Sequence, residues 1–174
     1  MNLTIPGLGL NATAHAAAHE LYRQCPWVQF TSGRRSLAEQ ARAMACNAAV
    51  RRDFIARTYI HGGEELQLVV NHHPEWETVE QLEHGLFAYM HDKMLPDRLS
   101  LLSRHMSGDA FDVLPLLGGS PVEREQASHT MHVIDRLPGL DKFLTHEAGL
   151  PRWHVQFVAS AALPLVGKHQ MTHV

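Results

Sequence analysis

The sequence has little of several features that mark large protein classes. Only two cysteines, Cys25 and Cys46, occur in 174 residues, and they form no Cys-x-x-Cys motif. This scarcity argues against a disulfide framework and against a zinc site built from thiolates. The net charge of -3 lacks the basic excess of a general nucleic-acid binder, so we expect no nucleic-acid partner. No segment approaches the ~20 apolar residues of a membrane-spanning helix, so we expect no membrane insertion.

The beginning of the chain also lacks a targeting signal. Residues 1–7 carry no basic segment and no apolar run of signal-peptide length, so we expect synthesis in the cytoplasm without a signal peptide. With 45% hydrophobic and 19% charged residues, the composition is that of an ordinary globular protein, and residues 1–174 are predicted to form one domain. The tail from about residue 165 is a candidate for disorder. The sequence indicates no oligomeric state.

Histidine, by contrast, is abundant, with 14 residues in the chain. His15 and His19 have the i, i+4 spacing of a metal-binding pair on a helix. Only alanines lie between them, so the glutamate of a His-Glu-x-x-His zinc motif is missing. We interpret three histidine pairs as non-ligands: His15 with His19, His72 with His73, and His129 with His132.

The segment from 103 to 113 predicts part of a metal site. His105 and Asp112 are seven residues apart, a spacing that would place them on opposite faces of one continuous strand. They converge only if the chain turns between them, and Gly108 is the residue at which a turn is least costly. A short strand over residues 109–114 is then predicted to carry Asp112.

A third ligand is predicted on a strand that begins at Trp153. Apolar and polar residues alternate over 153–158, which places His154 on the side opposite Trp153. The set of His105, Asp112 and His154 would leave a fourth tetrahedral position open for water. This is the pattern of catalytic rather than structural zinc, so the residues predict a hydrolytic zinc site.

These segments resemble a known family. Five residues match the Ser-x-His-x-x-Gly-x-Ala-x-Asp motif of the zinc D-Ala-D-Ala carboxypeptidases and dipeptidases, which include phage L-alanyl-D-glutamate endolysins: Ser103, His105, Gly108, Ala110 and Asp112. Trp153-His154 matches the closing Trp-His of that family. The segment 31–36 looks like its Ser-Gly-Tyr-Arg-Ser, with Arg34 in the place of the tyrosine and Arg35 in that of the substrate-binding arginine. The three motifs occur in the family's order and span most of the chain.

The resemblance implies a function and a set of residue roles. Zinc would be bound by His105, Asp112 and His154, and Arg35 with Ser103 would orient the peptide. The activity implied is hydrolysis of peptide bonds in peptidoglycan stem peptides by a phage endolysin or a virion-associated lysin, which would act on the cell wall after release or as part of a virion. Two alternatives stay open: a bacterial D-Ala-D-Ala carboxypeptidase or dipeptidase, and a non-catalytic zinc-containing domain that binds cell-wall or virion partners.

The catalytic base is where the chain departs from the family pattern. The family places a glutamate three residues before the closing histidine, but Pro151 occupies that position here. The nearest acid is Glu147. The turn composition of residues 147–151 would let this acid lie on a preceding strand and fold back over the metal. The resemblance therefore assigns the catalytic role to Glu147, with Asp141 and His146 as weaker alternatives.

The predicted elements assemble as an α+β fold. Strands near Val28, Asp109 and Trp153 would form a small antiparallel sheet, with helices on its apolar face and the metal on the other. The resemblance implies the fold of the hedgehog and D-Ala-D-Ala peptidase group. Helices are predicted over residues 12–23, 37–56, 78–94 and 122–137, and a short strand or loop is predicted over residues 66–70.

Overall fold

The computed structural model describes residues 3–59 and 61–159. Four strands form one antiparallel sheet in the order β1-β2-β4-β3, and several helices surround it, which confirms the predicted α+β class. The strands are β1 (Phe30–Ser32), β2 (Ala110–Val113), β3 (Leu140–Glu147) and β4 (Leu150–Phe157). The predicted tail from about residue 165 lies outside the described residues.

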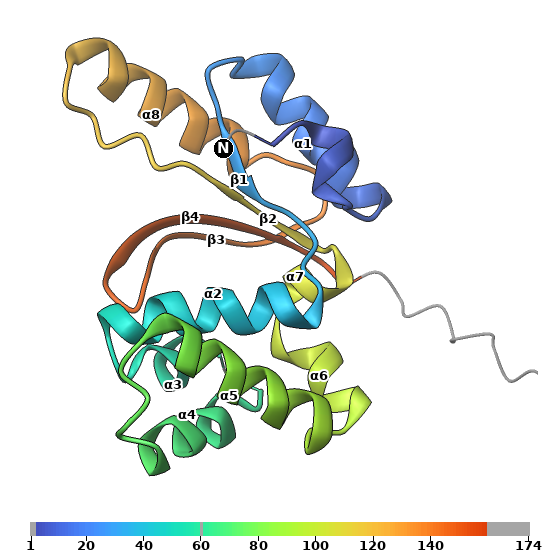
Figure 1. The fold of residues 1–174 in the computed structure, drawn as a ribbon. Helices are drawn as coiled ribbons and strands as arrows, with labels where there is room; N and C mark the ends of the chain where they lie inside the picture. Colours follow the sequence, from blue (N-terminus) through green and yellow to red (C-terminus); the bar gives the residue numbers. More distant parts are fainter. Residues whose placement is uncertain (1–2, 60, 160–174) are drawn as a thin grey trace, which may run out of the picture.

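The helices lie in two groups, on opposite sides of the sheet (Figure 1). One group packs on the apolar face and contains the 3-10 helix η1 (Ile5–Leu8), α1 (Ala12–Gln24) and α8 (Pro121–Ile134). The other lies across from the polar face and contains α2 (Leu37–Val50), α3 (Phe54–Thr58), α4 (Gly63–His72), α5 (Val79–Asp92) and α6 (Pro96–Leu102). The short α7 (Arg104–Ser107) leads into β2. The prediction of helices on the apolar face holds for α1 and α8. It was wrong for α2 and α5, which bury their apolar side chains in a separate core that does not include the sheet.

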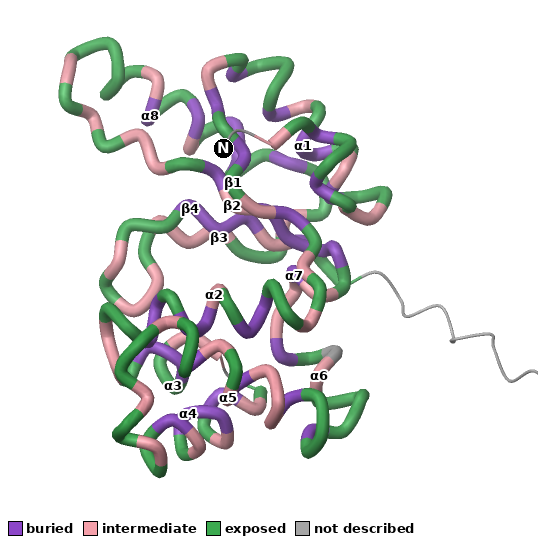
Figure 2. The backbone as a smooth tube through the Cα atoms, viewed as in Figure 1, coloured by how far each residue is buried: buried purple, intermediate pink, exposed green. Residues whose placement is uncertain are grey.

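Each group of helices has its own hydrophobic core, as the buried segments in Figure 2 show. In the first core, Phe111 and Phe157 from the sheet pack against Leu21 of α1 and Ile134 of α8. The second core lies within the helical layer and does not include the sheet. Neither core includes the polar face of the sheet. That face therefore lies between the first core and the helical layer.

Local sequence explains where several helices begin. Ser36 and Thr78 each accept a hydrogen bond from the backbone N–H three residues on, and Glu39 and Gln81 return the bond to the cap residue. These capping boxes satisfy N–H groups that have no partner within the helix. The predicted starts of α2 and α5 are confirmed.

Two predictions of secondary structure were wrong. Residues 66–70 form part of helix α4 rather than a strand or loop, with Leu66 and Val70 buried one turn apart and Leu68 exposed. A short apolar run does not by itself distinguish a strand from a helix, and packing within the second core decides it here. The helix predicted over 37–56 ends at Val50. The chain turns there, and the Arg52 guanidinium donates to the backbone carbonyls of Val70 in α4 and of His73 at its end.

Several short elements were not predicted from the periodicity, namely η1, α3, α6 and α7. A strand before the turn at residues 147–151 was predicted to carry Glu147, but its full pairing with β4 was not. Strands β3 and β4 form a hairpin whose turn residues, Ala148 and Gly149, both have positive φ, the backbone conformation of a type I′ turn. Within the described part of the chain, no helix has the length and hydrophobicity needed to cross a membrane.

The packing of the first core generates a stability prediction. Phe111 is fully buried, whereas Leu117 in the loop after β2 is 81% exposed. Phe111→Ala is expected to lower the free energy of unfolding by ~3–5 kcal/mol, because it leaves a cavity beside Phe30 and Phe157. Leu117→Ala should change it by less than ~0.5 kcal/mol. Denaturant unfolding of both variants makes the comparison, and equal effects would contradict the described core.

Candidate metal centre

His105 is presented by the one-turn helix α7. Ser103 caps this helix by accepting a hydrogen bond from the backbone N–H of His105, at 3.3 Å. The helix ends at Gly108, whose φ of 79° lies in the left-handed region that favours glycine. A side chain there would also crowd the backbone of the segment that precedes α1. The turn predicted between His105 and Asp112 is therefore present, and Gly108 is the residue that permits it.

Asp112 and His154 are brought together by strand register. The two residues lie directly opposite each other in the antiparallel pairing of β2 with β4. Cross-strand partners have side chains on the same face, about 5 Å apart at their Cβ atoms. The neighbours Trp153 and Val155 point into the first core on the other face. The alternation predicted for this strand is confirmed.

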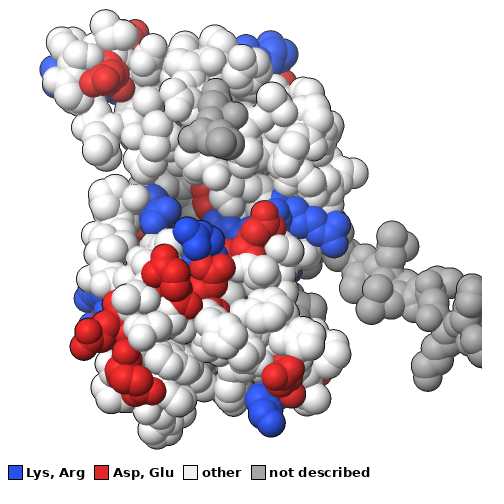
Figure 3. Space-filling view, in the orientation of Figure 1, with Lys and Arg blue, Asp and Glu red and all other residues white. Residues whose placement is uncertain are grey.

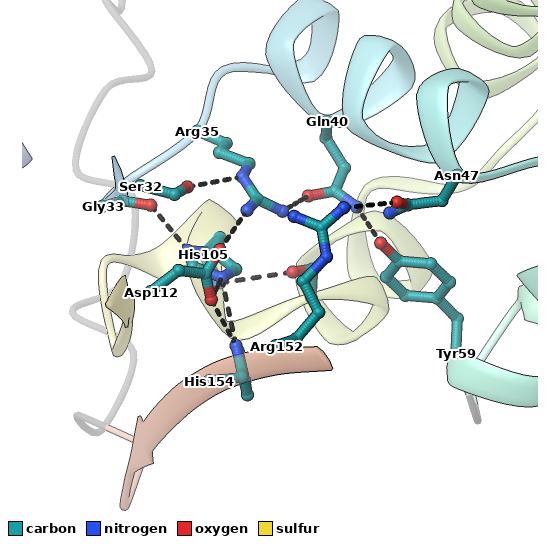
Figure 4. Close-up of polar contacts among 11 residues, drawn as sticks. Ser32, Gly33, Arg35, Gln40, Asn47, Tyr59, His105, Asp112, Arg152 and His154 are labelled. Carbon is teal, nitrogen blue, oxygen red and sulfur yellow. Dashed lines mark hydrogen bonds and ion pairs between the residues drawn. The ribbon is translucent and has the colours of Figure 1, made fainter. Parts of the chain in front are cut away.

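The three side chains converge on one point (Figure 4). Asp112 Oδ1 lies 3.2 Å from His105 Nε2 and 2.9 Å from His154 Nδ1, and the two histidine nitrogens are 3.2 Å apart. Metal–ligand bonds of ~2.0–2.2 Å would place neighbouring ligand atoms about 3 to 3.5 Å apart. Among the residues that the structure describes, this is the only group of three or more histidine, cysteine, aspartate or glutamate side chains close enough to hold a metal ion.

The orientation of His105 suits a ligand. Its Nδ1 lies 2.7 Å from the backbone carbonyl oxygen of Gly33. A carbonyl only accepts, so Nδ1 carries the proton and the lone pair of the neutral ring is on Nε2, toward Asp112 and His154. Outer hydrogen bonds of this kind fix the tautomer of metal-binding histidines. Gly33 has no room for a side chain, since a Cβ there would lie 2.2 Å from the carbonyl oxygen of Leu8.

Arg35 lies at the corner between β1 and α2, and its guanidinium contacts the candidate metal group of His105, Asp112 and His154. NH2 donates to Asp112 Oδ2 at 2.6 Å, Nε donates to Ser32 Oγ at 2.8 Å, and NH1 lies 3.4 Å from Gln40 Oε1. The fully buried Gln40 also donates to the Tyr59 hydroxyl at 3.1 Å. Arg35 thus balances the charge of Asp112 and leaves Oδ1 as the oxygen nearest both histidines.

Burial and neighbouring charges set the protonation states of the three ligands. Burial lowers the pKa of His105 and favours its neutral ring. Burial alone would raise the pKa of Asp112, but His105 and His154 hold it well below its usual range. For His154, burial opposes protonation, but the hydrogen bond to Asp112 raises the pKa overall. Neutral His105 and ionised Asp112 are the forms that bind metals, whereas a proton on His154 must leave.

The group lies in a cleft of about 340 Å³ between the polar face of the sheet and the helical layer. Charged side chains gather where the two halves of the molecule meet in Figure 3. Glu147, the last residue of β3, lines this cleft with His154, whereas Asp141 and His146 do not line it. Burial raises the pKa of Glu147, while the proximity of His154 acts in the opposite direction.

Several cleft residues were not identified from the sequence. Ser103 lines the cleft, and so do Tyr59, Asn47 and Arg152, with Gln40 behind Arg35. Arg152 could have been found, because it lies two residues before His154 on an alternating strand and therefore shares its face. The others come from helices whose position opposite the sheet depends on long-range packing.

The site geometry predicts one metal ion per chain. His105→Ala, Asp112→Asn and His154→Ala should each abolish stoichiometric metal in elemental analysis of the purified protein. The control is the double variant His15→Ala with His19→Ala, whose rings lie 4.7 Å apart on α1 and should not contribute a ligand. Protons compete with the metal for His154, whose pKa is raised. As the pH falls, metal release should therefore begin at a higher pH than it would if His154 had the pKa of an unperturbed histidine. Full metal content in the three ligand variants would contradict the site.

Comparison with known proteins yields no match to this chain among protein-family models, curated proteins or solved structures.

Proposed function

We propose that the chain is a zinc metallopeptidase that hydrolyses peptide bonds in peptidoglycan stem peptides. The observation that carries the proposal is the convergence of His105, Asp112 and His154, whose ligand atoms all lie within 4.8 Å of one another, in the cleft that Glu147 lines. Two histidines and one carboxylate with an open position are typical of catalytic zinc. The substrate class is supported by the sequence motifs around these ligands, which resemble those of the zinc D-Ala-D-Ala carboxypeptidases and dipeptidases.

Zinc bound at this site would polarise the scissile carbonyl and lower the pKa of a water molecule toward ~7. The same ligand types also hold Fe(II) in oxygenases. The metal found in the purified protein therefore separates two reaction classes. Zinc supports the peptidase, and stoichiometric iron contradicts it.

Glu147 would be the general base. A base is needed to take a proton from the attacking water and return it to the nitrogen of the leaving amine. Burial raises the pKa of this carboxyl, which brings it nearer to neutral pH and makes the carboxylate a stronger proton acceptor. Glu147 lies at the end of β3, next to the hairpin turn. Arg51 donates a hydrogen bond to the carbonyl of Ala148 in that turn, which gives the carboxyl group a defined position.

Arg35 and Ser103 would orient the peptide. Three of the five guanidinium N–H groups of Arg35 are used by the contacts described above, so two remain for the carbonyl oxygen of a bound substrate. Ser103 lines the same cleft beside His105. The enzyme would reach its substrate as a phage endolysin released from the cell or as a lysin carried by the virion.

The prediction that tests this function is the effect of Glu147→Gln. The substitution keeps the size of the side chain but removes the base, so hydrolysis of purified muropeptides should fall by ~10²–10⁴-fold. The metal content should stay at one ion per chain. Mass spectrometry of the muropeptide products, at equal metal occupancy, measures the rate and identifies the bond that is cut.

The matched controls are Asp141→Asn and His146→Gln, which change the two other candidate bases on β3. Both residues are exposed and neither lines the cleft, so their rates should stay near that of the unmodified protein. Full activity in Glu147→Gln would reject this base. Absence of cleavage by the unmodified, zinc-loaded protein on every muropeptide would favour a non-catalytic binding domain.

A further inference from the structure

The cleft holds more positive than negative side chains. Arg35, Arg104, Lys142 and Arg152 line it, against the carboxylates of Asp112 and Glu147. Arg35 is paired with Asp112 at 2.6 Å. Three basic side chains are then left against the single carboxylate of Glu147, before any metal charge is added. Clefts lined with an excess of one charge concentrate ligands of the opposite charge, so this cleft favours a substrate with a negative group.

Arg35 is poorly placed to hold that negative group. Its NH2, NH1 and Nε already contact Asp112, Gln40 and Ser32. Two N–H groups remain for a substrate, but the charge of the guanidinium is already paired with that of Asp112, so Arg35 adds little net positive charge for a second carboxylate.

Arg152 differs from Arg35 in its partner. It stands on β4 two residues before His154 and reaches across the cleft to helix α2, where NH2 donates to Asn47 Oδ1 at 2.7 Å (Figure 4). Asn47 is only 8% exposed and is uncharged. No ion pair of the described residues includes Arg152. One N–H orients the guanidinium. Its charge has no carboxylate partner at ion-pair distance and interacts with Glu147 only at longer range, where it acts to lower the pKa of that carboxyl.

A guanidinium held in this way matches a carboxylate. Its planar fork presents two parallel N–H groups, which bind both oxygens of a carboxylate at once. Because the bond to Asn47 already restricts the side chain, less conformational entropy is lost when a ligand binds. The substrates of the proposed function carry two such groups, namely a free C-terminal carboxylate and the α-carboxylate of a γ-linked glutamate.

We propose that Arg152, oriented by Asn47, is the substrate-binding residue that recognises a carboxylate of the peptide next to the bond that is cut. This inference rests on the proposed function and names the substrate class as peptides with a carboxylate near the scissile bond. The proposal also gives the two arginines different roles. Arg35 supports the metal ligand Asp112, and Arg152 selects the substrate.

The test compares binding of matched peptides to the zinc-loaded, full-length chain carrying Glu147→Gln. One pair is N-acetyl-D-Ala-D-Ala as the free acid and as the C-terminal amide. The other is L-Ala-γ-D-Glu-L-Lys with its glutamate α-carboxylate free or amidated. In at least one pair, calorimetry should show that the free acid binds at least about tenfold more tightly than the amide. A difference of this size is what charge-assisted hydrogen bonds contribute. The pair that shows the difference identifies which carboxylate is recognised.

Variants of Arg152 assign the difference to this residue. Arg152→Gln should bring the acid and amide of the sensitive pair to within about twofold, since the amide never had the charge contact. Arg152→Lys should recover only part of the preference, because it keeps the charge but loses the fork. Arg136→Gln, an exposed arginine after α8, removes the same charge outside the cleft and should leave the preference intact.

Other outcomes overturn the proposal. If Arg152 only tethers β4 to α2, Arg152→Gln will lower the unfolding temperature while the ratio of acid to amide affinity stays unchanged. The proposal is also overturned if neither pair shows tighter binding of the free acid, or if none of the four peptides binds. Binding is measured without turnover, so a preference that depends on Arg152 stands even if no muropeptide is cut. If the cleavage rate is unchanged by amidation of the substrate and by substitution of Arg152, the peptidase function is supported and this subsite is rejected.

Discussion

The carboxylate of Asp112, whose side chain is 14% exposed, is the charge on which the organisation of the site depends. A carboxylate withdrawn from water is stable only if other groups compensate it. Here the compensating groups come from distant parts of the chain, His154 from β4 and Arg35 from the corner before α2, and His105 from α7 brings its Nε2 to the same carboxylate. Each of the three sequence motifs thus contributes one contact to the same two oxygen atoms. Bringing those contacts together requires the helical layer, the sheet and the turn between them to be in place.

The two-core architecture explains how such a charge is accommodated. The first core uses the apolar face of the sheet, and the second is completed within the helices alone. Neither core needs the polar face, so that face and the facing side of α2 can carry ionisable groups. Contacts such as that between Arg152 and Asn47 then cross from one layer to the other. The cleft is therefore a consequence of how the apolar residues are distributed between the layers.

The cleft also shows why similar side chains take different roles. Arg35 and Arg152 both line it, yet one faces a carboxylate and the other an amide. The first is paired with the carboxylate of Asp112 in the candidate metal group, and the second has an uncharged partner across the same cleft. Likewise, three ionisable candidates lie on β3, but only Glu147 lines the cleft, because the register irregularity between Leu144 and His146 breaks the alternation of the strand before it. Partner identity, more than residue type, separates these roles.

The sequence by itself determined the features that depend on local patterns. Alternation around His154, the turn at Gly108 and the helix starts near residues 37 and 78 are short-range properties, and the structure has them where they were predicted. Only the tertiary structure decided that residues 66–70 are helical, that Arg35 pairs with Asp112, and that Arg152 reaches Asn47. Those outcomes join residues that are far apart in the chain. Strand register and the packing of one layer against another select such partners, and a local pattern carries no information about either.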